Sequence, residues 1–276
     1  MATTFPATNI IPKEIQREAA TLRDNYEKIM KHEGKFVLIK GDSIVSYSET
    51  YSAAVNEGYK RFRLENFLVR QVRATENVVR AMRCGVIKQD GKLRLTRAKV
   101  RWGRNWGGER FASKRAGSGA KVRKGSDIIK LTQGEPIIEV VLKPIVAYAE
   151  ALKAEGQPVP APITVQALID TGFTGTLMVA ESLVKSWRLK SRDWSQIGFP
   201  RDQEPRYFAL YAWNVDIGIK FPKCSHDGGN VLIETSATLV EMINSKNSNV
   251  LIGQQILETA LFIHDGPKDC FNLTFP

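Results

Sequence analysis

One short segment constrains the fold of this chain more than any other: an apolar run, 163–169, leads directly into Asp170, Thr171 and Gly172. The apolar residues of the run alternate, which predicts a β-strand with one buried face. A carboxylate at the end of a buried strand is costly unless polar groups surround it, and glycine lets the chain turn sharply behind it. This arrangement is typical of an active site, although an aspartate that only caps a turn has the same pattern.

Further strands are predicted on both sides of this turn. Upstream, the apolar run 136–142 predicts a strand, and a connection rich in Ala and Pro separates it from 163–169. Downstream, the apolar residues 250–252 precede Gly253, which opens a short helix, and a turn at 265–267 joins two runs that pair as a closing hairpin. The C-terminal part of the chain is therefore expected to be mostly β-structure.

These stretches resemble the two signatures of retropepsin-like (clan AA) aspartic proteases. Residues 167–177, Ala-Leu-Ile-Asp-Thr-Gly-Phe-Thr-Gly-Thr-Leu, resemble the active-site segment, and residues 249–257, Asn-Val-Leu-Ile-Gly-Gln-Gln-Ile-Leu, resemble the second signature. Phe173 after Asp-Thr-Gly is similar to a prokaryotic branch of this family, whereas retroviral members usually have Ala there. The resemblance covers roughly half of the chain and implies an all-β acid protease barrel, expected over residues 131–276.

The resemblance implies an aspartic endopeptidase that hydrolyses a polypeptide substrate without a metal or cofactor. Such chemistry needs two carboxylates about 3 Å apart that share one proton. One acts as general base on a water and the other as general acid on the scissile carbonyl. The chain has a single Asp-Thr-Gly, so a two-fold homodimer must supply the dyad from two copies of Asp170, the candidate catalytic residue. Four further residues are expected to support the turn without chemistry: Thr171, Gly172, Ile252 and Gly253.

Two features leave other functions open. The ring of Phe173 is expected to narrow the substrate channel, and Gln254-Gln255 replaces a polar residue followed by Asp or Asn in the family. One alternative is a non-catalytic retropepsin-like dimer that serves as an interaction module, and another is an unrelated β protein with a coincidental Asp-Thr-Gly. Residues 197–219 lie where the family has its substrate-covering flap, but they are equally compatible with core or dimer-contact strands.

The first part of the chain predicts a separate small α+β domain, residues 10–73. Gly-Asp at 41–42 lies between two apolar runs and indicates a hairpin. Gly34-Lys35-Phe36-Val37 and Gly41-Asp42 resemble a small bacterial domain of uncharacterised function that is often fused to other modules. We find no catalytic constellation in it and expect a packing or partner-docking role. The expected elements are a helix over 15–29, a hairpin over 36–47, a helix over 51–62 and a strand over 67–72.

The excess positive charge lies between these two parts, in a basic linker or extension expected over residues 74–130. Residues 60–125 hold 20 lysines and arginines against four acidic residues, whereas the net charge of the whole chain is +11. Cations interleaved with Trp102, Trp106 and Phe111 could bind nucleic acid or another polyanion weakly, through phosphates and stacked bases. The alternative is a solvated linker whose aromatic residues pack on a neighbouring domain.

Several classes of protein are disfavoured by composition. Three cysteines are too few and too scattered for a disulfide framework, and three isolated histidines do not complete a structural zinc site. No run approaches the roughly 18 apolar residues that a membrane helix needs. The first residues lack a basic start followed by an apolar core, so no secretory signal is expected. A cytoplasmic protein of α+β class, without metal or cofactor, is the expectation.

Overall fold

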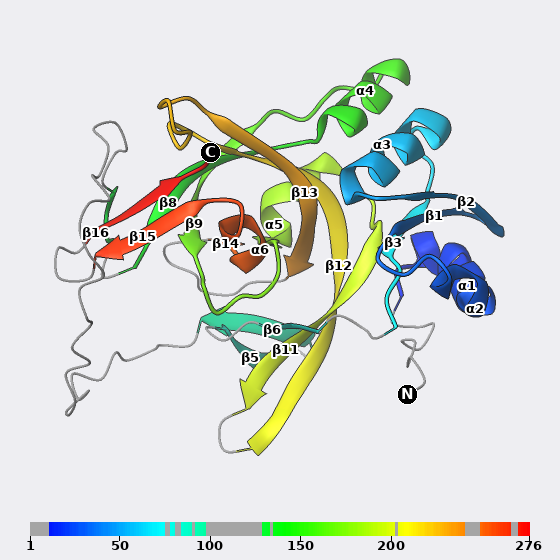
Figure 1. Cartoon of the computed structure of the whole chain (residues 1–276), viewed down its shortest axis with the longest axis horizontal. Coiled ribbons are helices and arrows are strands. Elements are labelled where there is room, and N and C mark those ends of the chain that lie inside the picture. The colour runs from blue at the N-terminus through cyan, green and yellow to red at the C-terminus, as the bar shows by residue number, and fades with distance from the viewer. Residues whose placement is uncertain are drawn as a thin grey trace.

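The computed structural model describes residues 11–74, 78–80, 84–89, 92–97, 129–132, 135–201, 204–240, 249–265 and 270–276. It has an α+β architecture, in which a closed barrel of six β-strands stands beside a smaller unit of helices and sheet (Figure 1). The predicted α+β class is therefore confirmed. No helix in these ranges is long and apolar enough to cross a membrane.

The N-terminal unit, defined here as residues 11–74, has its helices and strands where the sequence predicts them. They are a 3-10 turn at Lys13–Ile15, α1 (Gln16–Asp24), α2 (Tyr26–Met30), β1 (Phe36–Lys40), β2 (Ser43–Ser48), α3 (Tyr51–Phe62) and β3 (Leu68–Gln71). Thr50 caps α3, because its side chain accepts a hydrogen bond from Ala53 N at 3.2 Å. The helix predicted over 15–29 is divided at Asn25 into α1 and α2.

The core of this unit follows from the alternation of β1. The sheet has the order β2-β1-β3, and successive side chains of a strand point to opposite faces. Val37 and Ile39 are buried in a cluster with Leu22 of α1, whereas Leu38 is buried in another cluster with Val55 of α3. The sheet therefore lies between two helical layers.

The barrel is closed by strands from the C-terminal part of the chain. These are β8 (Ile137–Lys143), β9 (Ile163–Ile169), β10 (Leu177–Ala180), β12 (Glu204–Phe221), β13 (Val231–Val240) and β14 (Val250–Ile252). Their order is β13-β10-β14-β9-β8-β12, and pairing of β12 with β13 closes the ring. The strand predicted over 163–169 is confirmed with these bounds. Val140, Ile169, Val179 and Ile217 are among the buried residues that fill the barrel.

A long hairpin leaves the barrel at β12. The first part of β12 pairs antiparallel with β11 (Asp193–Arg201), from Asp193 opposite Asn214 to Arg201 opposite Glu204, and projects well beyond the barrel (Figure 1). β4 (Val78–Arg80) adds to β11 in parallel at the edge of the sheet. Residues 197–219, which the sequence resemblance compares with a flap, thus contribute to both strands of this hairpin.

The basic segment is partly ordered as strands. β4 is followed by β5 (Cys84–Gln89) and β6 (Lys92–Arg97), which pair as an antiparallel hairpin. Trp102, Trp106 and Phe111, the aromatic residues considered for base stacking, lie outside the described residues.

The closing hairpin predicted at the C-terminus is confirmed. β15 (Leu261–Asp265) pairs antiparallel with β16 (Cys270–Thr274), and β7 (Ile129–Lys130) lies on the other side of β16. This three-stranded sheet lies on the opposite side of the barrel from the N-terminal unit (Figure 1).

Three short helices of the C-terminal part complete the fold. These are α4 (Val146–Ala154), α5 (Glu181–Val184) and α6 (Gln254–Leu257). The sequence was interpreted as an irregular connection where α4 lies. Tyr148, Ala151 and Leu152 of α4 are buried in the same cluster as Leu38 and Val55 of the N-terminal unit, so the two parts of the chain share a core.

Candidate active site

Asp170 follows β9 directly and is held by the neighbouring strand. β9 and β14 run parallel, with Ile169 opposite Ile252, and Asp170 N donates a hydrogen bond to Ile252 O at 2.9 Å. Phe173 N donates to Asp170 O at 3.0 Å, which closes a tight turn. Gly172 N donates to the Asp170 carboxylate, at Oδ1, over 2.9 Å. The turn therefore fixes the direction of the carboxylate through its own backbone.

Gly253 lets the second segment approach this turn. A Cβ atom at this position would lie 2.1 Å from Gly175 O and 2.5 Å from Phe173 Cδ1, so only glycine fits without a shift of the turn. Gly253 N donates to Thr176 O at 2.9 Å. The five candidate residues from the sequence, Asp170, Thr171, Gly172, Ile252 and Gly253, are thus brought together at one end of the barrel.

The two glutamines after Gly253 bind the same turn. Gln254 N donates to Phe173 O at 2.8 Å, and its side-chain Nε2 donates to Thr171 O at 2.6 Å. Thr176 Oγ1 donates to Gln255 Oε1 at 2.8 Å. Sequence reasoning treated Gln254-Gln255 only as a departure from the family and missed this bracing role. The available signal was a pair of long amide side chains directly after a glycine that packs on a turn.

Phe173 is a core residue in this chain. Its ring is fully buried and belongs to a cluster with Met178 of β10, Leu251 of β14, and Ile197 and Ala212 of the β11–β12 hairpin. Ile197 and Ala212 of the hairpin thus pack in the same cluster as Phe173 of the Asp170 turn. The ring was expected to narrow a substrate channel, but it fills the space between the turn and the hairpin.

The carboxylate of Asp170 is inaccessible to solvent in the single chain. Asp170 has 0% exposure, whereas the neighbouring Thr171 is exposed. A substrate, or a second Asp170 about 3 Å away, needs a carboxylate at an accessible surface. Catalysis by Asp170 therefore requires a form of the protein in which this carboxylate is accessible.

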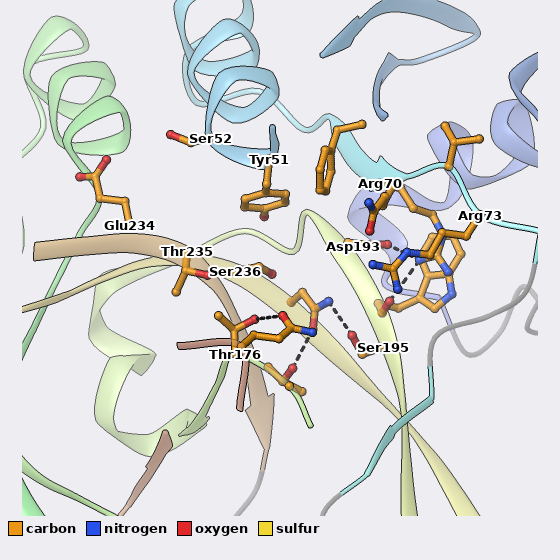
Figure 2. A pocket seen from close by; sticks show the side chains of 18 of the residues that line it. Tyr51, Ser52, Arg70, Arg73, Thr176, Asp193, Ser195, Glu234, Thr235 and Ser236 are labelled. Carbon is orange, nitrogen blue, oxygen red and sulfur yellow. Dashed lines mark hydrogen bonds and ion pairs between the residues drawn. The ribbon is translucent and has the colours of Figure 1, made fainter. Parts of the chain in front are cut away.

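A cavity of about 390 Å³ lies between the N-terminal unit and the barrel; we call it the inter-unit cavity. Asp170 is not among its lining residues, but the far end of the same turn, Gly175 and Thr176, borders it. Figure 2 shows Tyr51 and Ser52 of α3 on one side, with Thr235 and Ser236 of β13 opposite.

A buried polar network joins the two parts of the chain beside this cavity. Tyr51 Oη donates to Asp216 Oδ1 at 2.7 Å and Tyr59 Oη donates to Oδ2 at 3.1 Å. Arg192 Nε lies 3.6 Å from Asp216 Oδ2, and its guanidinium carbon lies 3.7 Å from the centre of the Phe67 ring. The network thus ties β12 of the barrel, and the residue just before β11, to α3 and to the residue just before β3.

Burial dominates the titration of this network. Loss of hydration raises the pKa of Asp216, and Arg192 and the two tyrosine hydroxyls oppose that rise only in part. Burial likewise raises the pKa of Tyr51 well above its usual value, and the Asp216 carboxylate adds to the rise. Both tyrosines therefore stay protonated and act as hydrogen-bond donors.

A second ion pair holds the start of β11. The Arg70 guanidinium of β3 pairs with the Asp193 carboxylate (Figure 2). Arg70 Nη1 also donates to Trp194 O at 3.1 Å, and the guanidinium lies 4.1 Å from the Trp194 ring centre. Trp194 itself is buried in the core cluster of the N-terminal unit. Residues 192–194, which are the residue before β11 and the first two residues of β11, therefore fix the root of the hairpin.

The described residues contain no cluster of three or more His, Cys, Asp or Glu side chains that could hold a metal ion. Comparison with protein-family models finds no match for this chain, and comparison with curated proteins finds none either.

Proposed function

We propose that this chain is an aspartic endopeptidase that acts as a homodimer, with Asp170 supplied by each copy. The observation that carries the proposal is the juxtaposition of two segments. A carboxylate that leaves a barrel strand is oriented by Gly172 N, while Gly253 packs so closely on the turn that no other residue fits. The sequence resemblance associates the same two segments with a retropepsin-like site.

The proposed chemistry needs two Asp170 carboxyls that share one proton. The ionised carboxylate takes a proton from water as the water attacks the scissile carbonyl, and the protonated carboxyl gives its proton to the carbonyl oxygen. Activity is therefore expected to follow a bell-shaped pH profile on the acidic side. The β11–β12 hairpin, whose base packs with Phe173, is the proposed cover over the bound substrate.

The proposed dimer contact is the outer edge of β15. Among the described strands, β15 has a neighbour only in β16, so one of its edges is available for pairing with another copy. Leu261 and Ile263 are 59% and 47% exposed, and their spacing puts both on one face of the strand. Exposed apolar side chains on an open edge favour association of two copies.

The burial of Asp170 favours a second candidate, a non-catalytic interaction module of the same fold. In that case, Asp170 serves only to hold the turn, and the basic residues between 60 and 125 dock an acidic partner or nucleic acid. Such docking should weaken steeply with salt, because it releases counterions. Retention on heparin that is unchanged between low and high salt would argue against this role.

A digestion assay separates the two candidates. Casein and a peptide library are incubated with the native chain and with Asp170→Asn from pH 3 to pH 7. Asp24→Asn, which changes an exposed carboxylate paired with Arg23, is the matched control. The peptidase proposal expects cleavage by the native chain and the control only. Cleavage at the native rate by Asp170→Asn would refute it, and absence of cleavage by all three would favour the interaction module.

A further inference from the structure

Among the described residues, the inter-unit cavity combines a strand edge that lacks a paired neighbour, polar side chains and one arginine that forms no ion pair. We propose that it binds an extended acidic peptide at a site separate from Asp170. This proposal does not rest on peptidase activity. The volume of about 390 Å³ falls in the range of about 300–1,000 Å³ that ligand sites occupy, and boundaries between folded units are frequent places for them.

The first argument is the edge of β13. Residues 231–239 pair with β12 on one side, whereas β10 pairs only with 237–240 on the other. Four consecutive residues, Ile233, Glu234, Thr235 and Ser236, line the cavity. Consecutive side chains point to opposite faces of a strand. A cavity that is lined by all four residues must therefore lie along the edge of the strand.

An open edge recognises a peptide through its main chain. Alternate residues of β13 direct their N–H and C=O groups away from β12, and an added strand can bond to these groups. Four residues span about 13 Å at about 3.3 Å per residue. The site is therefore matched to a short extended segment.

The second argument is the charge of the lining. Arg73 lines the cavity, is exposed and forms no ion pair with any residue that the structure describes. The other charged groups there are engaged: Arg70 pairs with Asp193, and Glu234 Oε1 accepts a hydrogen bond from Val146 N at 2.7 Å. The available guanidinium selects a carboxylate on the peptide.

The third argument is the nature of the remaining walls. Ser52 and Thr235 offer hydroxyls on opposite sides of the cavity (Figure 2). Phe36 and Tyr51 offer rings, packed edge to face with centres 5.7 Å apart. Hydroxyls and aromatic faces between two strand-bearing units suit alternating polar and apolar side chains of an extended peptide.

The position of the site gives it access to the candidate active site. Thr176 and Gln255, which bond each other at 2.8 Å beside the Asp170 turn, line the cavity. Ser195 and Asn214 at the hairpin root line it too. A bound peptide would therefore contact both the turn and the hairpin root.

The test uses the full chain carrying Asp170→Asn, so that no probe can be cleaved and binding is measured apart from activity. The probes are fluorescein-labelled octapeptides rich in Val and Thr, with Glu, Gln or Lys at one central position. Fluorescence polarisation gives each Kd. Two further variants test the charge: Arg73→Ala, and Arg61→Ala as an exposed control. Two more test the cavity wall: Ser52→Trp, which places a large ring there from an exposed helix position, and Ser52→Ala as its control.

The Glu peptide should bind about tenfold more tightly than the Lys peptide, equivalent to about 1.4 kcal/mol. Arg73→Ala should remove this preference and Arg61→Ala should retain it. Ser52→Trp, but not Ser52→Ala, should abolish binding, and N-methylation of alternate backbone nitrogens of the probe should do the same. Absence of binding by every peptide, equal binding of the N-methylated probe, or indifference to both Ser52→Trp and Arg73→Ala would overturn the proposal.

Discussion

Replacing Gly253 by alanine should disturb the candidate active site, because the added methyl group has no room beside the Asp170 turn. The added Cβ would lie 2.1 Å from Gly175 O, 2.5 Å from Phe173 Cδ1 and 2.8 Å from Phe173 O. Two of these atoms are backbone oxygens, which cannot rotate away as the end of a flexible side chain can. Relief requires the turn to withdraw by about 1.3 Å, so that the shortest of these contacts lengthens from 2.1 Å to 3.4 Å, where ordinary contact begins.

The cost can be worked from the bonds that this withdrawal disturbs. Overpacking of a rigid site costs about 1–3 kcal/mol. The bonds from Gly253 N to Thr176 O and from Gln254 N to Phe173 O contribute about 1 kcal/mol each. The φ of Gly253 is −98°, so alanine adds no backbone strain and recovers about 0.4–1 kcal/mol of unfolded-state entropy. The expected net loss is about 3 kcal/mol.

Urea unfolding of the native chain and two variants measures this loss. Gly156→Ala is the control, because Gly156 has a φ of +66° but nothing within 4 Å of the added Cβ. This variant should lose only roughly 1 kcal/mol of unfolding free energy, which is the cost of a left-handed backbone conformation for alanine. If Gly253→Ala unfolds at the same urea concentration as Gly156→Ala, the close packing of the two segments is refuted.

Three further predictions concern the buried network and the dimer edge. Arg192→Met should lower the free energy of unfolding by about 3–5 kcal/mol at neutral pH, because it leaves Asp216 buried without a counter-charge. In urea unfolding, the double variant with Asp216→Asn should recover part of this loss. Losses that simply add in the double variant would contradict the pairing of Arg192 with Asp216. Because burial raises the pKa of Asp216 above its usual 3.8, its stabilising contribution is complete below about pH 4 and is lost as pH rises through the raised pKa. The native chain should therefore lose stability relative to Asp216→Asn as the pH rises above about 4, and a stability difference that does not change with pH would contradict this. Leu261→Glu with Ile263→Glu should convert a dimer to a monomer in sedimentation, whereas unchanged association would exclude the β15 edge.

The parts of the fold that the sequence predicts correctly depend on local pattern. Alternating residues over 163–169 predict β9, and the glycine after Asp170 predicts the turn. The interruption of the first helix was missed, because it depends on a side-chain contact. Asn25 Nδ2 donates to Thr21 O at 2.9 Å, and this bond competes with the helical backbone.

The parts that were missed depend on contacts between distant residues. α4 buries Tyr148, Ala151 and Leu152 against the N-terminal unit, a surface that no local pattern reveals. Tyr51 and Asp216 are separated by 165 positions, so their bond could not be predicted from spacing. One signal was available, since an aspartate between apolar residues of a predicted strand must find buried partners.

The same contacts explain why the two parts of the chain stabilise each other. Arg192 and Asp216 belong to the barrel side, but Tyr51, Tyr59 and the Phe67 ring complete their surroundings. Without the N-terminal unit, this ion pair would lose two hydroxyl donors and its aromatic cover. The unit also fixes the root of the β11–β12 hairpin, while the Phe173 cluster holds the hairpin further along. A movement of the hairpin away from the Asp170 turn would therefore have to break the Phe173 cluster, while the contacts of residues 192–194 still hold its start.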